Sequence, residues 1–178
     1  MTLALCSALA VQTPAPPVLI KAGRLVDGRS QQVQSNVGIL VEGERIKAVG
    51  PLAQVQAQAA NARVIDLSQM TVLPGMIDAH THLLLQGDIT NQEYEDQLLK
   101  QSIPYRAILA ARNAALALQH GFTAIRDVET EGAMYADVDV KLAVNRGEVP
   151  GPRIFASTPA MAPPGMYAIG TAHWEVEL

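Results

Sequence analysis

Two histidines separated by one residue, His80 and His82, are the residues of this sequence whose types and spacing most clearly suggest chemistry. Side chains alternate between the two faces of a β-strand, so in an extended segment both imidazoles project to the same side. Two neutral imidazoles one strand repeat apart can bind one divalent ion at bond lengths of about 2.0–2.1 Å. Asp78 is predicted on the same face and could orient one imidazole. A bare His-x-His tripeptide also arises by chance, as surface histidines or as histidines satisfied within a core.

The elements predicted around this pair favour the metal site. The apolar segment 71–82, with a bend at Pro74-Gly75, is predicted to be a strand whose other face, with Ile77, Ala79 and Thr81, packs against helices. Strands and helices then alternate, which implies parallel strands joined by helical crossovers. The predicted elements are helices over 90–100, 104–120 and 134–145 and strands over 122–128 and 153–157. The histidines end the first strand, and active sites of β/α barrels lie at that end.

Local signals set the ends of two of these helices. Thr90 followed by Glu93 forms a possible capping box. Pro104 lies just inside the start of the longer helix, and Gly121 suits its left-handed stop. His120 at that end is expected to complement the helix dipole rather than to bind a metal. The spacing predicts one apolar face for this helix, formed by Ile108, Ala111, Ala115 and Leu118.

The segment 18–68 predicts a small all-β module with a structural role. Residues 36–50 alternate as a hairpin with Gly43 in the turn. A polar link over 54–61 precedes a further strand over 63–67. The segment has no cluster of His, Cys or carboxylate residues, which is why we assign no chemistry to it.

Composition excludes several classes of protein. The chain has 178 residues, 49% of them hydrophobic, which is typical of a globular core and argues against disorder. Its 13 Lys and Arg against 17 Asp and Glu give a net charge of −4, so nucleic acid is not the expected partner. No apolar run has the length of a membrane span. The single cysteine, Cys6, excludes an internal disulfide framework.

Residues 1–17 differ from the rest of the chain. Residues 1–11 are apolar, 8–10 (ALA) fit the small-x-small pattern of a signal-peptidase site, and prolines follow. No Lys or Arg precedes Lys21, so the basic start of an export signal is missing. We interpret 1–17 as a signal-peptide remnant with a Pro-rich entry, which predicts a periplasmic or secreted protein. A frayed N-terminus of a cytoplasmic protein is the alternative.

Longer runs of sequence resemble the metal-dependent amidohydrolase superfamily, in its imidazolonepropionase-like and Xaa-Pro dipeptidase-like branch. The similar runs are 23–28, 41–50, 64–67, 72–82 (VLPGMIDAHTH), 121–128 (GFTAIRDV) and 151–154. The resemblance implies an α/β fold: the N-terminal part of a (β/α)₈ TIM barrel, about three βα units long, preceded by a partial small β-sandwich. The implied domains are the entry 1–17, the partial sandwich 18–70 and the partial barrel 71–178.

The resemblance also implies hydrolysis of an amide or other C–N bond. In this superfamily a hydroxide on the metal attacks a carbonyl, and the metal is usually zinc, as one or two ions. His80 and His82 would bind it, with Asp78 behind them. The other ligands and the general acid/base come from later barrel strands, so we expect this chain to be truncated and inactive alone. The alternative is a stand-alone, non-catalytic module or assembly partner that uses its open sheet edge.

Two further residues are candidates for the substrate side of the site. Asp127 ends the second strand. It could contact the substrate or support a residue that does, and the alternative is that it pairs with Arg126 or with a loop amide. His173 lies in the last loop. Where this branch often carries a Gly-Gly-His stretch, the sequence reads PPGMY at 163–167, and His173 is the candidate to take the place of that histidine. The expected substrate of the full-length form is a small molecule or dipeptide-like compound. A homo-oligomer is compatible with the open sheet edge.

Overall fold

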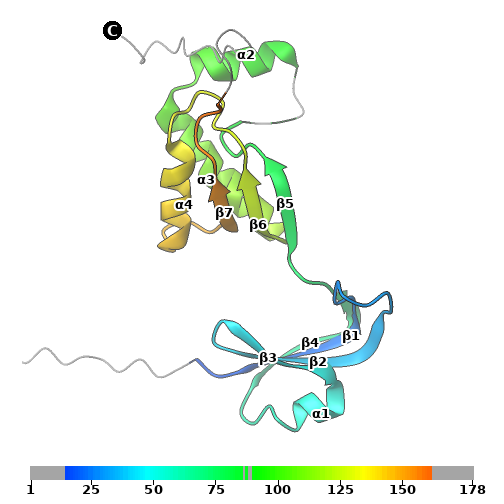
Figure 1. The fold of residues 1–178 in the computed structure, drawn as a ribbon. Helices are drawn as coiled ribbons and strands as arrows, with labels where there is room; N and C mark the ends of the chain where they lie inside the picture. Colours follow the sequence, from blue (N-terminus) through cyan, green and yellow to red (C-terminus); the bar gives the residue numbers. More distant parts are fainter. Residues whose placement is uncertain (1–14, 86, 88–89, 162–178) are drawn as a thin grey trace, which may run out of the picture. The chain divides into compact units, whose positions relative to one another are not determined.

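The computed structural model describes residues 15–85, 87 and 90–161 as two compact units that meet between Pro74 and Gly75 (Figure 1). This boundary lies beyond the predicted one after residue 70, because Thr71 and Val72 still belong to the last strand of the first unit. Most of the predicted signal remnant, and His173, lie outside the described residues. Within the described ranges, no helix is long and apolar enough to cross a membrane.

The first unit is a four-stranded sheet with the order β3-β2-β1-β4. β2 pairs antiparallel with β1 and β3, whereas β1 and β4 are parallel. The unit is therefore not purely antiparallel, and it includes a short helix, α1, in the segment predicted as a polar link. The bounds are β1 Val18–Leu25, β2 Gln34–Glu42, β3 Arg45–Pro51, α1 Leu52–Gln56 and β4 Arg63–Val72.

Both faces of this sheet carry apolar side chains. Leu19 and Leu40 pack with Val55 of α1, and Ala22, Val37 and neighbouring residues form a second cluster. The predicted hairpin is confirmed by β2 and β3, whose turn places Gly43 at a φ of 57°, a conformation that favours glycine. These two clusters form the apolar core of the unit.

The second unit contains a parallel sheet with the order β5-β6-β7. Its bounds are β5 Met76–Thr81, α2 Asn91–Lys100, α3 Ile103–Gln119, β6 Phe122–Asp127, α4 Ala136–Asn145 and β7 Arg153–Ala156. Right-handed crossovers between neighbouring parallel strands place successive helices on the same side of a sheet. α3 and α4 lie along one side of this one, as Figure 1 shows. The predicted alternation of strands and helices is confirmed.

The helix ends in this unit follow the predicted local signals. The side chain of Thr90 accepts a hydrogen bond from the Glu93 N–H, and the Glu93 carboxylate accepts one from the Thr90 N–H. Beyond α3, Gly121 has a φ of +90°, as the predicted stop requires. The Nδ1 atom of His120 lies 2.9 Å from the carbonyl oxygen of Leu116, which confirms its expected role at the helix end.

The apolar face predicted for the longer helix is not the face that the structure buries most deeply. Ile108 is 68% exposed, and the fully buried side chains of α3 are Arg106, Ala110 and Ala114. The small alanines allow α3 to approach Leu83, Leu84 and Ile125 closely. The buried face includes the charged residue Arg106, so it does not follow an apolar pattern. The apolar periodicity of the sequence therefore indicated a different face.

Candidate functional site

The segments that follow β5, β6 and β7 meet at one edge of the sheet. All three strands are parallel, so their carboxyl ends lie at the same edge. The N–H of Val128 donates to the carbonyl of Thr81 at 3.0 Å, which joins the first two segments. The hydroxyl of Ser157 donates to the carbonyl of Asp127 at 2.8 Å and joins the third. This edge is where side chains from different strands can act together.

The two histidines lie at this edge with their rings close together. The ring centres of His80 and His82 are 5.5 Å apart and the ring planes are inclined by 69°. His80 is exposed, and the side chain of His82 is 30% exposed. Rings that each offer a nitrogen to one ion at about 2.0–2.1 Å have centres on the order of 5 Å apart. The observed separation of the two ring centres is of this order.

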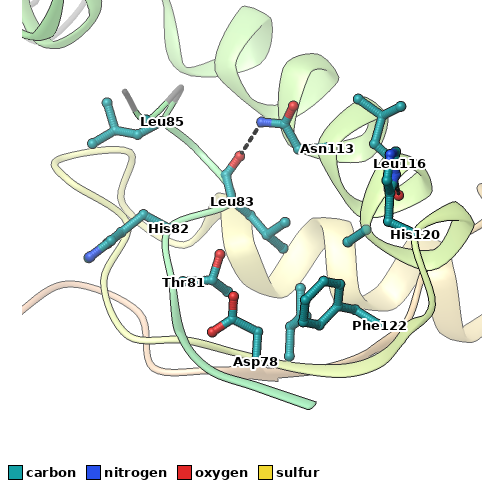
Figure 2. A pocket seen from close by; sticks show the side chains of 12 residues that line it. Asp78, Thr81, His82, Leu83, Leu85, Asn113, Leu116, His120 and Phe122 are labelled. Carbon is teal, nitrogen blue, oxygen red and sulfur yellow. Dashed lines mark hydrogen bonds between the residues drawn. The ribbon is translucent and has the colours of Figure 1, made fainter. Parts of the chain in front are cut away.

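Strand β5 is irregular just before the histidines. Asp78 is paired with Ile125 of β6 and Thr81 with Asp127, so three steps on β5 match two on β6. As a result Asp78 and Thr81, which strict alternation predicted on opposite faces, line the same groove (Figure 2). The other predicted helix-facing residues, Ile77 and Ala79, are exposed; for Ile77 the exposed fraction is 71%. That part of the strand prediction is wrong.

Asp78 hydrogen-bonds to backbone rather than to an imidazole. Its Oδ1 atom accepts the N–H of His80 at 3.0 Å, which fixes the bend of the strand. The carboxylate lies in a groove of about 460 Å³ between β5, the start of β6 and the C-terminal half of α3. The Asn113 amide donates to the Leu83 carbonyl at 3.0 Å in the groove wall (Figure 2). Leu83, Leu116 and other apolar residues make the rest of this wall.

The Nδ1 atom of His82 faces the segment that follows β6. It lies 3.3 Å from the carbonyl oxygen of Glu129 and 3.7 Å from Oε1 of Glu131. The other carboxylate oxygen of Glu131 accepts the hydroxyl of Tyr94, from α2, at 2.8 Å. A buried carboxylate thus lies beside one imidazole of the pair.

Arg106 of α3 hydrogen-bonds to both the segment that follows β5 and the segment that follows β6. Its guanidinium donates to three carbonyl oxygens, those of Leu84 at 3.0 Å, Thr130 at 3.0 Å and Glu131 at 2.9 Å. The side chain is only 2% exposed, and burial lowers its pKa while the charge of Glu131 opposes that effect. Sequence reasoning missed Arg106 and Glu131. The sequence did contain a signal for Arg106: Ala110 and Ala114 follow it at four and eight residues, so all three share one face of α3.

Asp127 lies beneath the site rather than at its surface. It is 0% exposed, and burial together with the neighbouring Asp137 carboxylate raises its pKa to about 6. The N–H groups of Glu129 and Leu83 favour the ionised form, but neither oxygen of Asp127 has a well-directed hydrogen bond. Arg126 donates to the carbonyl of Ala79 at 2.6 Å instead, so the predicted alternative, an Arg126–Asp127 pair, does not form.

Two imidazoles are the candidate metal ligands that the described part of the chain brings together. Within residues 15–85, 87 and 90–161, no group of three or more His, Cys, Asp or Glu side chains is arranged to hold a metal ion. Catalytic zinc has three protein ligands as a rule. The predicted candidate His173 lies outside the described residues.

Comparisons with known proteins find relatives of both units. Residues 71–173 match the Amidohydrolase family, and 38–62 match the imidazolonepropionase-like composite domain of bacteria. An imidazolonepropionase of Halobacterium salinarum is 33% identical over 124 residues, which cover 68% of this chain and 29% of that protein. An N-substituted formamide deformylase of Arthrobacter pascens is 48% identical over 61 residues, covering 34% of this chain and 11% of that protein.

The solved structures give the same picture of the fold. A Xaa-Pro dipeptidase with methionine bound in its active site superposes with a TM-score of 0.66 and 30% identity, covering 82% of this chain and 34% of the dipeptidase. Its relatives are TIM barrels, which confirms the predicted fold class: the second unit is part of a (β/α)₈ barrel. The chain thus spans about a third or less of the length of the proteins it matches.

Proposed function

The chain belongs to the amidohydrolase family, and we propose that it provides the first metal ligands of a metal-dependent hydrolase acting on amide or other C–N bonds. The observation that carries this proposal is the pair His80 and His82, with ring centres 5.5 Å apart at the carboxyl edge of a parallel sheet. This edge is the location of active sites in β/α barrels.

His80 and His82 would together hold one divalent ion, with zinc as the expected metal because zinc accepts imidazole nitrogen readily. When bound, the ion would supply Lewis acidity toward a carbonyl and lower the pKa of a water molecule. Asp78 fixes the backbone just before the two histidines by accepting the N–H of His80. The rigid strand leaves the imidazoles little conformational freedom to lose on binding.

His80 and His82 would supply two of the three protein ligands that a catalytic zinc has as a rule, and the described residues hold no group of three or more candidate ligands. We therefore propose that turnover requires additional ligands from other barrel segments, and that the 178-residue chain by itself binds metal weakly without hydrolysing substrate. The apolar faces of a partial barrel would also favour association of this chain in solution.

The names of the relatives suggest a substrate class. They include an imidazolonepropionase, a formamide deformylase and a Xaa-Pro dipeptidase, which are hydrolases of C–N bonds in small compounds. We propose a substrate of this kind, a small amide or a dipeptide-like molecule, for the barrel to which this segment contributes.

The proposal is tested by measuring Zn²⁺ and Co²⁺ binding to the 178-residue chain by competition with a chromophoric chelator. His80→Ala and His82→Ala should each weaken binding about tenfold or more, because each removes one of two ligands. His120→Gln is the matched control: this histidine interacts with the Leu116 carbonyl and should not affect binding.

Two results would contradict the proposal. Metal binding that does not depend on His80 and His82 would remove its basis. Hydrolysis of dipeptides, formamides or cyclic amides by the chain alone would overturn the claim that further ligands are needed. Absence of histidine-dependent binding would favour the non-catalytic module as the function of this chain.

A further inference from the structure

One nitrogen of His82 has its hydrogen-bonding role fixed by its surroundings. Nδ1 lies 3.3 Å from the carbonyl oxygen of Glu129, and a carbonyl oxygen can only accept a hydrogen bond. In the neutral ring, Nδ1 must therefore carry the proton, which leaves Nε2 with a free lone pair. Free imidazole side chains in water favour the opposite tautomer, so the protein has to stabilise this one.

The carboxylate of Glu131 is placed to supply part of that stabilisation. Its Oε1 atom lies 3.7 Å from the same Nδ1, and its Oε2 atom accepts the hydroxyl of Tyr94 at 2.8 Å. Glu131 is 6% exposed, so its negative charge acts on the ring with little screening by water. A negative charge beside Nδ1 favours the tautomer that keeps a proton there.

The backbone of Glu131 is held in an unfavourable conformation to achieve this placement. Its φ is 50°, in the left-handed region that non-glycine residues rarely occupy. The Arg106 guanidinium, itself buried, donates to the Glu131 carbonyl at 2.9 Å and keeps it there. Gly132 follows directly, so a glycine at 131 would satisfy the turn with less strain. Arg106 therefore fixes the position of a buried carboxylate beside His82.

We propose that Glu131 is a positioning residue for His82: with the Glu129 carbonyl it keeps the proton on Nδ1 and presents Nε2 as the metal-binding nitrogen. Tyr94 and Arg106 hold Glu131 in place from α2 and α3. This inference rests on the proposed function, because it is the metal ion that would use Nε2. Nothing in the sequence pattern around the His-x-His pair indicated Glu131.

The test compares the wild-type chain with Glu131→Gly. Glycine tolerates a φ of 50°, so the melting temperature should be unchanged or raised while the carboxylate is lost. At pH 8, without metal, ¹⁵N chemical shifts should report the Nδ1–H tautomer of His82 in wild type and a mixture of tautomers in the variant. Zn²⁺ affinity should fall about tenfold.

Glu131→Gln and Glu148→Gln complete the design. The glutamine at 131 keeps the size of the side chain but removes the negative charge that faces Nδ1, so it should lose most of the tautomer preference and most of the affinity, as Glu131→Gly does. Glu148 is an exposed glutamate distant from the histidines in sequence, and its variant should match wild type in both measurements. A purely structural role of Glu131 would lower the melting temperature and leave the tautomer unchanged.

The outcomes separate this inference from the proposed function. An Nε2–H tautomer in wild type, or an Nδ1–H tautomer that persists in Glu131→Gly, overturns the role of Glu131 even if zinc binds through His80 and His82. A carboxylate-dependent Nδ1–H tautomer supports the positioning role. If that tautomer occurs without histidine-dependent metal binding, the metal site fails and Glu131 still orients the ring.

Discussion

The two compact units place their charged side chains in opposite ways. In the first unit none of the described charged residues is buried, and they interact locally: Asp27 accepts the N–H groups of Arg29 and Ser30, and Lys47 pairs with Glu42. In the second unit several are buried. Within the described ranges, all the buried polar or charged residues lie between positions 97 and 137: Gln97, Arg106, Asp127, Glu129, Thr130, Glu131 and Asp137.

This difference separates what folds the chain from what serves a site. A buried polar group costs free energy unless it is well paired, so a unit that only needs a core avoids it. The first unit does so: Leu19, Leu40 and Val55 form an apolar cluster against its sheet. The second unit buries polar and charged side chains near the edge of its sheet where the two histidines lie. Such local concentration of buried charge is typical of functional sites.

The largest expected effect comes from Arg106→Met, which removes the donors to three buried carbonyls while keeping a long side chain. Each unsatisfied buried carbonyl costs about 1–3 kcal/mol, so we expect a loss of about 3–5 kcal/mol in the stability of the second unit. Hydrogen exchange followed by mass spectrometry should show loss of protection over 75–161 and unchanged protection over 18–72.

The matched variant in the first unit is Gly23→Ala. A Cβ atom at this position would overlap the carbonyl oxygen of Ser68 on the neighbouring strand. Overpacking of this kind costs about 1–3 kcal/mol, and protection should be lost over 18–72 instead. If either variant removed protection from both units equally, the two would not be separate stability units.

Asp127→Asn tests the cost of burying charge in the second unit. The pKa of Asp127 is about 6 in the folded chain and near its ordinary value of 3.8 when unfolded. Between these two values the folded state binds more protons, so wild-type stability falls as pH rises from about 4 to about 6 and then stays lowered. The neutral asparagine avoids this loss. In urea unfolding of metal-free protein, the variant should be more stable than wild type by about 2–3 kcal/mol at pH 8 and similar to it at pH 4.

The control for this variant is Glu95→Gln, which neutralises an exposed carboxylate of α2. It should reproduce the wild-type dependence of stability on pH. An Asp127→Asn profile parallel to wild type at every pH would mean that Asp127 is ionised in the folded chain without penalty.

The smallest expected effect comes from Asp27→Asn in the first unit. The N–H groups of Ser30 and Arg29 hold the pKa of the Asp27 carboxyl below its ordinary value. The contribution of this carboxylate to folding stability is therefore present at pH values above its ordinary pKa. It is lost as the pH falls through the lower pKa of the folded state. Because water screens it, the urea midpoint at pH 7 should not change measurably. A clear loss of stability would contradict the contrast drawn between the two units.

Local features of this protein were determined by its sequence. The hairpin turn at Gly43, the capping box of Thr90 and Glu93, and the helix stop at Gly121 were all predicted and are all present. Each depends on residues within about four positions along the chain, so the chain carries the whole interaction in one short segment. The order of strands and helices, and with it the parallel sheet, followed from periodicity in the same way.

Only the tertiary structure decided which residues surround the histidines. Arg106 reaches carbonyls 22 to 25 residues away along the chain, and the irregular pairing of Asp78 and Thr81 is set by β6, more than 40 residues later. The segment that follows this strand brings Glu131 to His82. Contacts of this kind depend on how two separate elements pack against each other. A short sequence pattern does not contain this information, because the residues that make such contacts are far apart in the chain and meet only when the sheet forms.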